Sequence, residues 1–363
     1  MKKIISIIVS SIIIILLVLF IFLPKNSFSN NENRYLEKFP KISVESIFDG
    51  TYMKKFESYV EDHFPFREFF LSLKTNVFKL SGMTKQSDVY FGSEKYLLQE
   101  YPSPSSSDKI IRIVNRFVDN NKDVNIDFLL APTSVYVNNN KLPDNSINND
   151  EGIVIDYYKE KLNVNFIDIK EELLKNNDKY LYYKTDHHWT TYGAEEAYLV
   201  YCKNKGLPPF NYEYELVSDV FYGTLYSKVI DNSLEYDSIY KIKDDSEYEV
   251  YYSDKDITTD TLYKESYLKE KDKYSYFLDN NHDLITITNK SINEDSELLI
   301  IKDSYANAFI PFITKHYKKI HVIDPRYYRK SISEYIKENH ISNILFLYNI
   351  LTIDDDLGIR NVR

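Results

Sequence analysis

The chain has 363 residues, the length of about two domains, and its 45 basic and 55 acidic side chains give a formal net charge of −10. A chain this acidic lacks the clustered Lys and Arg that nucleic acid backbones require, so we expect no nucleic acid partner. The single cysteine, Cys202, excludes internal disulfides, cysteine-ligated iron–sulfur clusters and cysteine zinc sites.

The first segment is an uncharged apolar run, Ile4–Leu23, which follows two lysines and stops at Pro24. Twenty helical residues span about 30 Å, the hydrocarbon thickness of a bilayer, whereas a signal-peptide core has only about 7–15 residues. We therefore predict an uncleaved anchor, with a cleaved signal peptide as the alternative. Residues 1–25 are then a cytoplasmic stub and transmembrane helix. The lysines stay cytoplasmic, so the protein is a single-pass cell-membrane protein with an extracytoplasmic main domain.

The remaining chain divides by composition. Residues 26–86 are polar, with apolar side chains at helical spacing, and predict a helical N-terminal lead-in. Residues 87–363 predict one α/β domain. Within that domain, residues 211–289 are crowded with Asp, Glu, Lys, Ser and Tyr in short alternating pieces. This pattern predicts a β-rich insertion.

Short apolar runs alternate with amphipathic stretches on both sides of the insertion. Strands are predicted at 125–130, 164–169, 298–301, 320–323 and 344–348. Helices are predicted at 193–203, 306–316 and 331–339. Strands separated by helices indicate right-handed crossovers, so we expect an α/β fold with a parallel sheet flanked by helices.

A serine follows one predicted strand directly, in the sequence Lys302-Asp303-Ser304-Tyr305, and a helix is predicted after it. A hydroxyl at such a turn projects at the carboxyl edge of the sheet, where α/β ligand sites form. The amides of Ser304 and Tyr305 would lie at the N-terminus of the helix, where they can stabilise an oxyanion. The alternative is an ordinary helix N-cap, since Asp and Ser are favoured there for backbone reasons alone.

A second motif, Thr-Asp-His-His-Trp-Thr-Thr at 185–191, precedes another predicted helix. In an extended segment residues i and i+2 face the same side, so Asp186 and His188 converge while His187 faces the opposite way. A carboxylate beside an imidazole fixes its tautomer and stabilises the imidazolium, as in the base half of a hydrolytic triad. We expect Trp189 to be a core wedge behind the histidine.

The same motif also fits three alternatives: surface polar residues, a structural hydrogen-bonded cluster, and metal ligands. Asp-His-His occurs in manganese phosphoesterases, but these need further spaced Asp ligands near the start of the chain, which here is the apolar segment. We therefore expect no metal and no cofactor. Together with the serine, the motif completes Ser–His–Asp chemistry.

Both motifs resemble the DHHW family of bacterial exported proteins. The resemblance rests on Thr-Asp-His-His-Trp at 185–189 and Lys-Asp-Ser-Tyr-Ala-Asn-Ala-Phe at 302–309. It extends to shorter motifs at 32–34, 62–67, 89–92, 131–133, 221–224 and 324–326. That family is similar to the SGNH-hydrolase-like domains of alginate and cell-wall polysaccharide O-acetyltransferases. The resemblance implies an SGNH-like fold with Asp186 as orienting carboxylate, His188 as base and Ser304 as nucleophile.

The chain also departs from ordinary SGNH hydrolases. Lys302 replaces their glycine before Asp-Ser, and their Asp-x-x-His motif at the chain end is here placed before the serine. Their oxyanion glycine and asparagine have no assigned counterpart, so Asn307 and Asn349 are candidates. Tyr305 is either an oxyanion donor or a core aromatic. Arg326 either binds a glycan or carboxylate or forms a structural ion pair.

The resemblance implies an extracytoplasmic O-acetyltransferase that acts on a secreted or cell-wall polysaccharide. Acetyl-CoA is not expected outside the cell, so a membrane-bound O-acyltransferase is the implied acetyl donor. The alternatives are a polysaccharide acetyl esterase and an inert membrane-tethered glycan-binding or assembly factor. Five tyrosines of the insertion either stack on sugar rings or fill the core of small β elements. They are Tyr226, Tyr236, Tyr240, Tyr251 and Tyr252.

Overall fold

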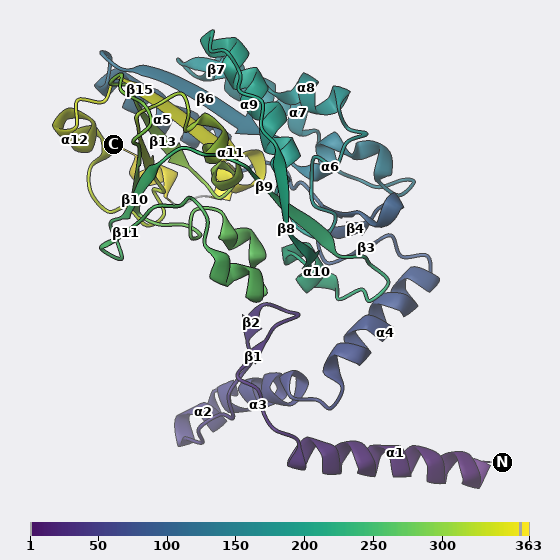
Figure 1. Cartoon of the computed structure of the whole chain (residues 1–363). Coiled ribbons are helices and arrows are strands. Elements are labelled where there is room, and N and C mark those ends of the chain that lie inside the picture. Colours follow the sequence, from purple (N-terminus) through teal and green to yellow (C-terminus); the bar gives the residue numbers. More distant parts are fainter. Residues whose placement is uncertain (1, 356–357, 363) are drawn as a thin grey trace. The chain divides into compact units, whose positions relative to one another are not determined.

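The computed structural model describes residues 2–355 and 358–362 and divides the chain into two compact units (Figure 1). Unit 1 comprises Met1–Ser87 with Tyr226–Leu234. Unit 2 comprises Asp88–Leu225 with Glu235–Arg363. The segment 226–234 therefore leaves the second unit in sequence and belongs by its contacts to the first.

Unit 1 is mainly helical, as its composition predicted. Its helices are α1 (Lys2–Phe22), α2 (Val44–Phe48), α3 (Thr51–Asp62) and α4 (Arg67–Leu80). Its short strands are β1 (Phe28–Ser29), β2 (Arg34–Tyr35) and β3 (Lys85–Gln86). The predicted apolar helix is confirmed as α1, whose 21 residues are long and apolar enough to cross a membrane. A membrane anchor and a signal sequence share that property.

An ion-pair cluster ties the lead-in of unit 1 together. The Arg67 guanidinium donates to both carboxylate oxygens of Glu32, at 2.9 and 2.8 Å. Arg34 donates to Glu32 and to the buried Asp62, which also accepts the Glu37 amide at 2.7 Å. Arg–carboxylate pairs of this bidentate kind fix geometry as well as charge. The motifs at 32–34 and 62–67 are thus structural: they join the β1–β2 hairpin to the end of α3 and the start of α4.

Unit 2 is built on an eight-stranded sheet of order β11-β10-β12-β14-β13-β15-β6-β7. The strands in chain order are β6 (Asn125–Ala131), β7 (Asn165–Ile167), β10 (Tyr248–Tyr252), β11 (Ile257–Thr259), β12 (Leu284–Asn289), β13 (Glu297–Lys302), β14 (Lys319–Ile323) and β15 (Asn343–Asn349). Two antiparallel pairs lie outside this sheet, β4 (Val89–Phe91) with β5 (Leu97–Gln99), and β8 (Tyr214–Phe221) with β9 (Asp237–Ile242).

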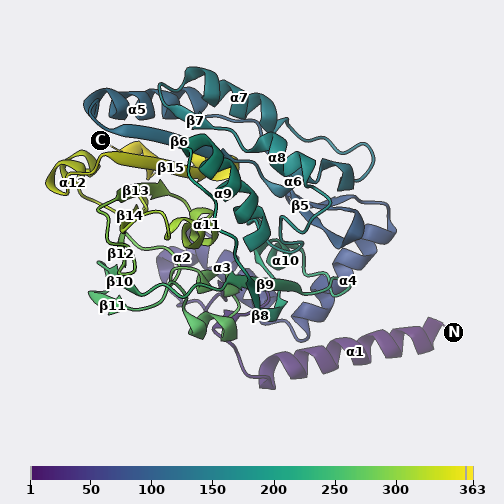
Figure 2. The ribbon, with the colours of Figure 1, turned by 45° about the horizontal axis from the view of Figure 1, so that its top comes forward.

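Helices cover both faces of the sheet. The helices of unit 2 are α5 (Ser107–Asn120), α6 (Ser134–Val137), α7 (Glu151–Lys161), α8 (Lys170–Lys175), α9 (Thr191–Lys205), α11 (Ala306–Ile313), α12 (Ile332–Glu338) and α13 (Ile350–Asp355). Helix α10 (Thr224–Val229) begins in unit 2 and continues into the segment that belongs to unit 1. Side chains of β13 alternate between two cores, Leu298 and Ile300 facing α9 and α11, Leu299 and Ile301 facing α5, α7 and α12. Figure 2 shows α5 and α7 on the opposite side of the sheet from α9 and α11.

The prediction of a parallel sheet is correct only for part of it. Strands β14, β13, β15, β6 and β7 pair in parallel, whereas β11, β10 and β12 add antiparallel pairs. The latter strands come from the predicted insertion, which extends the central sheet instead of forming a separate β piece. In β10, Tyr248, Val250 and Tyr252 are buried while the residues between them are exposed. That period-2 pattern identifies a strand, but it carries no information about its partner.

Three elements differ from prediction by more than one residue at an end. The strand predicted at 164–169 is only β7, Asn165–Ile167. The helix predicted at 306–316 ends at Ile313, soon after an internal proline, Pro311. The helix predicted at 193–203 is longer, since Thr190 caps the start of α9 and Gly206 ends it in a left-handed conformation. Glycine adopts the left-handed conformation at little cost and therefore often ends a helix. A helix end predicted from apolar spacing alone does not take this glycine into account.

A buried carboxyl lies at the start of α7. Glu151 is fully buried and accepts hydrogen bonds from the Thr133 amide, at 2.7 Å, and from the Thr133 hydroxyl. Burial raises the pKa of Glu151 to about 7, and the Thr133 bonds oppose that rise. The folded chain therefore keeps a proton that the unfolded chain loses near pH 4.5. The contribution of Glu151 to the free energy of unfolding consequently falls as pH rises through this window and is constant above about pH 7.

We predict that Glu151→Gln removes this pH dependence. Glutamine keeps an acceptor oxygen and carries no charge. As pH rises from about 4.5 to 7, the free energy of unfolding of the variant should therefore increase by about 3 kcal/mol relative to that of the wild type. Urea unfolding of the detergent-solubilised chain at pH 5 and pH 8, followed by the fluorescence of its single tryptophan, measures this difference. Glu160→Gln, on an exposed residue of the same helix, is the control. Parallel pH profiles for wild type and Glu151→Gln would contradict the prediction.

Candidate active site

Ser304 lies on the turn between β13 and α11, as the sequence predicted. The buried Asp303 carboxylate fixes this turn, since it accepts the Tyr305 amide at 2.9 Å and the Asn349 amide at 2.8 Å. The second of these bonds links the end of β13 to the end of β15. The hydroxyl of Ser304 is thus held at the carboxyl edge of the sheet, where sites form in α/β folds.

The Asp-His-His segment is a series of bends, not the extended segment that we expected. The His188 amide donates to Asp186 Oδ1 at 3.0 Å, which is an Asx turn, and the ring Nδ1–H donates to the same oxygen at 2.6 Å. Asp186 and His188 do converge, but through this turn. The expectation that His187 faces the opposite way is wrong, because the two imidazole rings lie 3.8 Å apart.

Asp186 is a buried anion with a full set of donors. Its Oδ2 accepts the Thr224 amide at 2.8 Å and the Thr224 hydroxyl at 3.0 Å. Burial alone would raise the pKa of Asp186, but the charges of His187 and His188, with the hydrogen bonds from His188 and Thr224, hold that pKa well below its usual range. The carboxylate therefore stays ionised across the physiological pH range.

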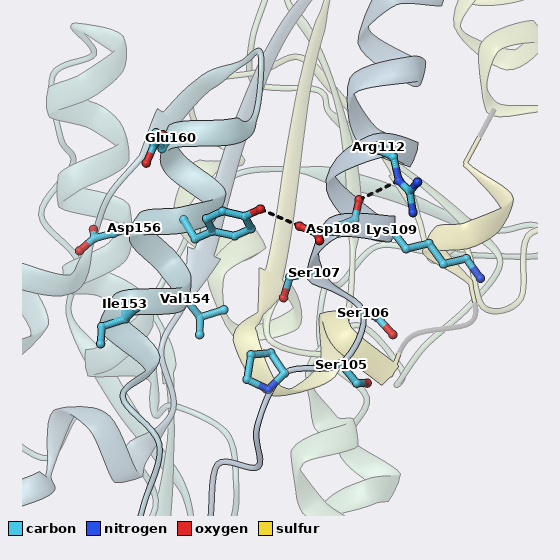
Figure 3. A pocket seen from close by; sticks show the side chains of 12 residues that line it. Ser105, Ser106, Ser107, Asp108, Lys109, Arg112, Ile153, Val154, Asp156 and Glu160 are labelled. Carbon is cyan, nitrogen blue, oxygen red and sulfur yellow. Dashed lines mark hydrogen bonds between the residues drawn. The ribbon is translucent and has the colours of Figure 1, made fainter.

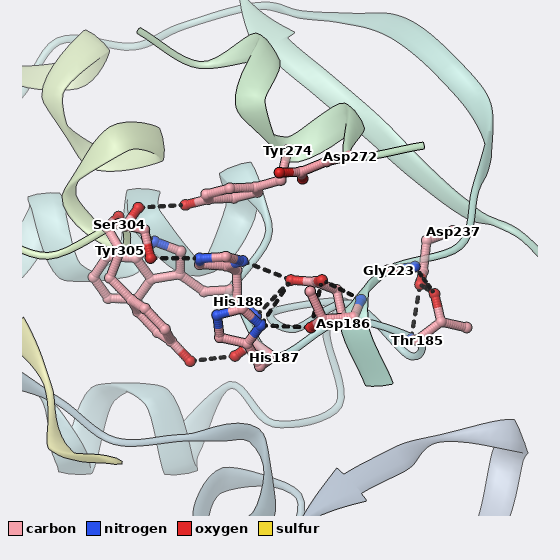
Figure 4. A network of polar contacts seen from close by, with 12 residues as sticks. Thr185, Asp186, His187, His188, Gly223, Asp237, Asp272, Tyr274, Ser304 and Tyr305 are labelled. Carbon is pink, nitrogen blue, oxygen red and sulfur yellow. Dashed lines mark hydrogen bonds and ion pairs between the residues drawn. The ribbon is translucent and has the colours of Figure 1, made fainter. Parts of the chain in front are cut away.

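The second ring nitrogen of His188 completes the chain of contacts. Its Nε2 lies 2.8 Å from Ser304 Oγ, so with the neutral imidazole the serine hydroxyl donates to it (Figure 4). The structure thus brings Asp186, His188 and Ser304 into one line of hydrogen bonds, with His188 only 5% exposed. This is the arrangement in which a serine hydroxyl can lose its proton to a neighbouring base.

Three consecutive residues of the site, Asp186, His187 and His188, also present metal-ligand atoms. One ligand atom each from Asp186, His187 and His188 lies within 4.8 Å of the others. His187 Nδ1 is hydrogen bonded to the Thr224 hydroxyl at 2.7 Å, and both nitrogens of His188 are hydrogen bonded. A metal ion at His188 would replace the bond to Asp186 or the bond to Ser304. The donor set fits the hydrogen-bonded triad better than a metal centre.

Tyr274 is a site residue that the sequence did not reveal. It belongs to a short 3-10 helix, Lys273–Tyr276, within the 211–289 stretch. Its ring stacks on the His188 imidazole, with centroids 3.7 Å apart and planes at 7°, and its hydroxyl donates to the Ser304 carbonyl at 3.1 Å. The tyrosine therefore contacts both the His188 imidazole and the Ser304 backbone. In a chain with 34 tyrosines, nothing local marked this one.

A second contribution from this stretch is the Gly223–Thr224 pair. A Cβ on Gly223 would lie 2.2 Å from Asp186 Cβ and 2.4 Å from its Oδ2, closer than atoms pack. The Gly223 amide donates to the Thr185 hydroxyl at 3.0 Å, and Thr185 in turn donates to the buried Asp237. The Gly223–Thr224 pair belongs to the Phe-Tyr-Gly-Thr motif at 221–224, on which part of the family resemblance rests. This motif is the feature of the sequence from which the pair could have been identified.

Three of the residues predicted as oxyanion donors, Tyr305, Asn307 and Asn349, are engaged elsewhere. The Tyr305 amide is bonded to Asp303, and its fully buried hydroxyl donates to the His187 carbonyl, so Tyr305 is a core aromatic. Asn307 donates to the Asn280 carbonyl at 3.3 Å and accepts from Lys302 at 2.7 Å. Asn349 donates to the Ala131 carbonyl at 3.2 Å and accepts the Leu351 amide at 3.0 Å. In this structure these two carboxamides support the backbone around the turn.

Arg326 forms the ion pair that the sequence left open. Its Nε and Nη2 donate to the two oxygens of Asp324 at 2.9 and 2.6 Å, while its side chain remains 28% exposed. Lys302 is fully buried, with its Nζ 3.8 Å from Asp324 Oδ2, and it donates to Asn281 Oδ1 at 2.5 Å. Burial lowers the pKa of Lys302 to about 8, which the nearby Asp324 opposes. Lys302, which stands where ordinary SGNH hydrolases have a glycine before Asp-Ser, is thus a buried cation paired with Asp324.

The buried indole of Trp189 packs against Tyr305, with ring centroids 5.1 Å apart, and its Nε1–H donates to the Tyr305 carbonyl at 2.9 Å. It therefore lies beneath the turn as a core side chain. The tyrosines of the insertion divide: Tyr226 and Tyr252 are buried, whereas Tyr236 and Tyr251 are exposed.

A separate cavity of about 780 Å³ lies between the start of α5 and the face of α7 (Figure 3). At its wall the Tyr157 hydroxyl donates to Asp108 at 2.6 Å. None of the residues that line this cavity belongs to the hydrogen-bonded chain around Ser304. The cavity is therefore distinct from the candidate active site.

Comparisons with known proteins agree with this architecture. The family model described as DHHW protein matches residues 86–323, which include the Asp186–Trp189 motif and Ser304. A comparison with curated proteins finds no match. A DHHW family protein from Eubacterium siraeum is similar in structure, with 24% identity and a TM-score of 0.67 over 77% of this chain and 97% of that chain.

Two further solved structures resemble the chain. Bacillus cereus PatB1, solved with a sulfonyl adduct, has 20% identity and a TM-score of 0.63 over 76% of this chain and 98% of that chain. The O-acetyltransferase domain of Pseudomonas putida AlgJ has 13% identity and a TM-score of 0.46 over 75% of this chain and 95% of that chain. The fold of this chain is thus shared with the Eubacterium protein and PatB1.

We predict that Gly223→Ala slows the reaction of Ser304 with an aryl sulfonyl fluoride, because the added methyl group displaces the Asp186 carboxylate. Intact mass spectrometry of the full chain measures the rate of adduct formation. Gly206→Asn is the control: it lies in open space, and asparagine tolerates its left-handed backbone. Equal adduct rates for wild type and Gly223→Ala would contradict a role for the Asp186 position.

We also predict that Tyr274→Leu lowers the same rate about 2- to 10-fold, since a stacked aromatic pair contributes about 0.5–1.5 kcal/mol. Tyr274→Phe keeps the ring and should lose less. Because Tyr274 acts through His188, the pH profile of the Leu variant should shift, which a merely structural loss would not produce. Tyr35→Leu, on an exposed tyrosine of unit 1, serves as the control and should react like wild type.

Proposed function

The chain belongs to the DHHW family, and we propose that it is an extracytoplasmic O-acetyltransferase that acetylates hydroxyls of a secreted or cell-wall polysaccharide. The observation that carries this proposal is the unbroken chain of hydrogen bonds from the ionised Asp186 through His188 to Ser304. The resemblance to SGNH-like O-acetyltransferases supports the choice of reaction. PatB1, a protein of similar fold, carries a sulfonyl adduct, the product expected when an activated nucleophile meets a sulfonyl reagent.

The reaction has two halves that use the same base. In the first, His188 Nε2 takes the proton of Ser304 while Oγ attacks the acetyl carbonyl of the donor ester. The tetrahedral intermediate collapses, the bond to the donor oxygen breaks, and His188 returns its proton to that oxygen. Acetyl-Ser304 remains. Asp186 stays ionised throughout and stabilises the imidazolium that forms at each proton transfer.

In the second half a sugar hydroxyl loses its proton to His188 and attacks the acetyl carbonyl of acetyl-Ser304. The bond between the carbonyl carbon and Ser304 Oγ breaks, and Oγ takes the proton from His188. One acetyl group has then moved from the donor to the polysaccharide, and the enzyme is restored. If water replaces the sugar hydroxyl, the same steps give an esterase.

The proposed setting is the outer face of the cell membrane. With α1 as an anchor, the catalytic unit is extracytoplasmic and has no access to acetyl-CoA. The donor we propose is therefore a membrane-bound O-acyltransferase that brings the acetyl group across the bilayer. The exposed Tyr236 and Tyr251 and the partly exposed Arg326 are candidate contacts for the polysaccharide.

We predict that the full chain, incubated with an activated acetyl ester such as 4-nitrophenyl acetate, gains the mass of one acetyl group. Ser304→Ala should show no adduct because it lacks the nucleophile, and His188→Ala should acetylate far more slowly because it lacks the base. Ser103→Ala, on an exposed serine, is the matched control and should react like wild type. An acetyl adduct that survives Ser304→Ala would contradict the assignment of the nucleophile.

Oligosaccharides offered to the adduct distinguish the transferase from the esterase. A transferase loses its acetyl group faster as the oligosaccharide concentration rises and yields an acetylated sugar. An esterase loses it to water at a rate that is independent of the sugar. In cells, equal polysaccharide acetylation with wild type and Ser304→Ala would favour the inert glycan-binding or assembly factor and refute the enzymatic proposal.

A further inference from the structure

Helix α4 exposes its apolar side. The residues Phe66, Phe69, Phe70, Leu73, Val77 and Leu80 form the α4 stripe. All six are solvent-exposed, Leu80 at 87% and Phe69 at 61%. With 3.6 residues per turn the five positions within α4 fall on one side of the helix, and Phe66 directly precedes the helix. A surface helix of a soluble protein normally turns such a side toward the core.

The opposite side of α4 is polar and is already occupied. Ser72 and Thr75 are buried, and the Thr75 hydroxyl donates to the Val229 carbonyl. Lys79 pairs with the buried carboxylate of Asp231 at 2.8 Å. These contacts bind α4 to the segment 226–234 of the same unit. The helix therefore cannot turn its stripe inward without breaking them.

The stripe begins where the apolar helix α1 ends. Leu23 and Pro24, which follow α1, line a cavity of about 510 Å³ together with Phe66 and Phe69. Phe20 of α1 also packs edge-on against Tyr59 of α3, with ring centroids 6.1 Å apart. Within unit 1, the surface that faces outward on α4 is thus continuous with the end of the helix that is apolar enough to span a bilayer.

We propose that the α4 stripe lies in the interfacial layer of the membrane that α1 spans, with its Phe, Leu and Val side chains among the lipid acyl chains. An apolar side made of Phe and Leu, continuous with a spanning helix, suits an interfacial helix. Lys74 stands exposed at the edge of the stripe, where its ammonium can reach lipid phosphates. The bidentate Arg67–Glu32 pair fixes the start of α4, so the helix is held in place before it meets lipid.

The proposal rests on α1 being a membrane anchor and not on catalysis. It gives unit 1 a second contact with the bilayer besides the spanning helix. Its test measures lipid contact alone. A failure here would therefore leave the acetyltransferase proposal untouched, and an inactive enzyme would leave this proposal untouched.

The experiment uses the full chain in vesicles of phosphatidylcholine and phosphatidylglycerol. Single cysteines replace Leu73, Val77 or, as the control on the opposite side of α4, the exposed Glu68, in a Cys202→Ser background. Each carries an environment-sensitive fluorophore, and part of the lipid is brominated in its acyl chains. We expect a loss of fluorescence of about twofold or more at positions 73 and 77 and little loss at position 68.

Two outcomes of the quenching experiment overturn the proposal. Labels at 73 and 77 that are not quenched by brominated lipid but are quenched by aqueous iodide would show that the stripe faces water. Labels that neither reagent quenches would show that protein, from a second copy or a partner, covers it. A label at position 73 replaces one of the apolar side chains of the stripe, so a second variant keeps an aromatic side chain in the stripe. Phe69→p-benzoylphenylalanine should crosslink to lipid on illumination. A crosslink to protein instead would also overturn the proposal.

Discussion

The candidate active site depends on one buried negative charge. Asp186 is 2% exposed, and a carboxylate in that position is stable as an anion only if donors replace the lost water. The structure supplies four donors: the ring and amide of His188, and the amide and hydroxyl of Thr224. Gly223 leaves the space that the carboxylate occupies. His188 and Thr224 are thus held by hydrogen bonds to this carboxylate. The bond between Asp186 and the His188 ring also orients the Nε2 of that ring toward Ser304.

The parts of the site come from distant segments that the sheet gathers. His188 and Ser304 are separated by 116 residues, and the stretch between them supplies Thr224 beside the carboxylate and Tyr274 above the imidazole. The stretch 211–289 is therefore not an addition to a finished domain. It provides strands β10 to β12 for one end of the central sheet and side chains for the site itself. An α/β core without it would lack two of the contacts that hold Asp186 and His188 in place.

The sequence predicted what is encoded locally. Ser304 follows a buried strand and precedes a helix, and the Asp-x-His spacing of Asp186 and His188 is visible in five letters. Antiparallel pairing of the insertion was not predictable, because alternation specifies a strand and not its neighbour. Tyr274 was not predictable either, since its role depends on a stack that only the folded chain creates. Asn349 was placed correctly at the end of its strand, but the bonds that occupy its carboxamide are tertiary.

The Asp303 carboxylate joins the ends of β13 and β15 through the amides of Tyr305 and Asn349. One of its oxygens is thus bonded to the backbone of the turn that follows β13, and the other to the backbone at the end of the neighbouring strand β15. A turn clamped in this way loses its conformational freedom when the protein folds, not when a substrate arrives. In the proposed reaction, the entropy of ordering the serine is therefore absent from the activation barrier of each turnover, and the hydroxyl would meet every new acyl donor in the same orientation.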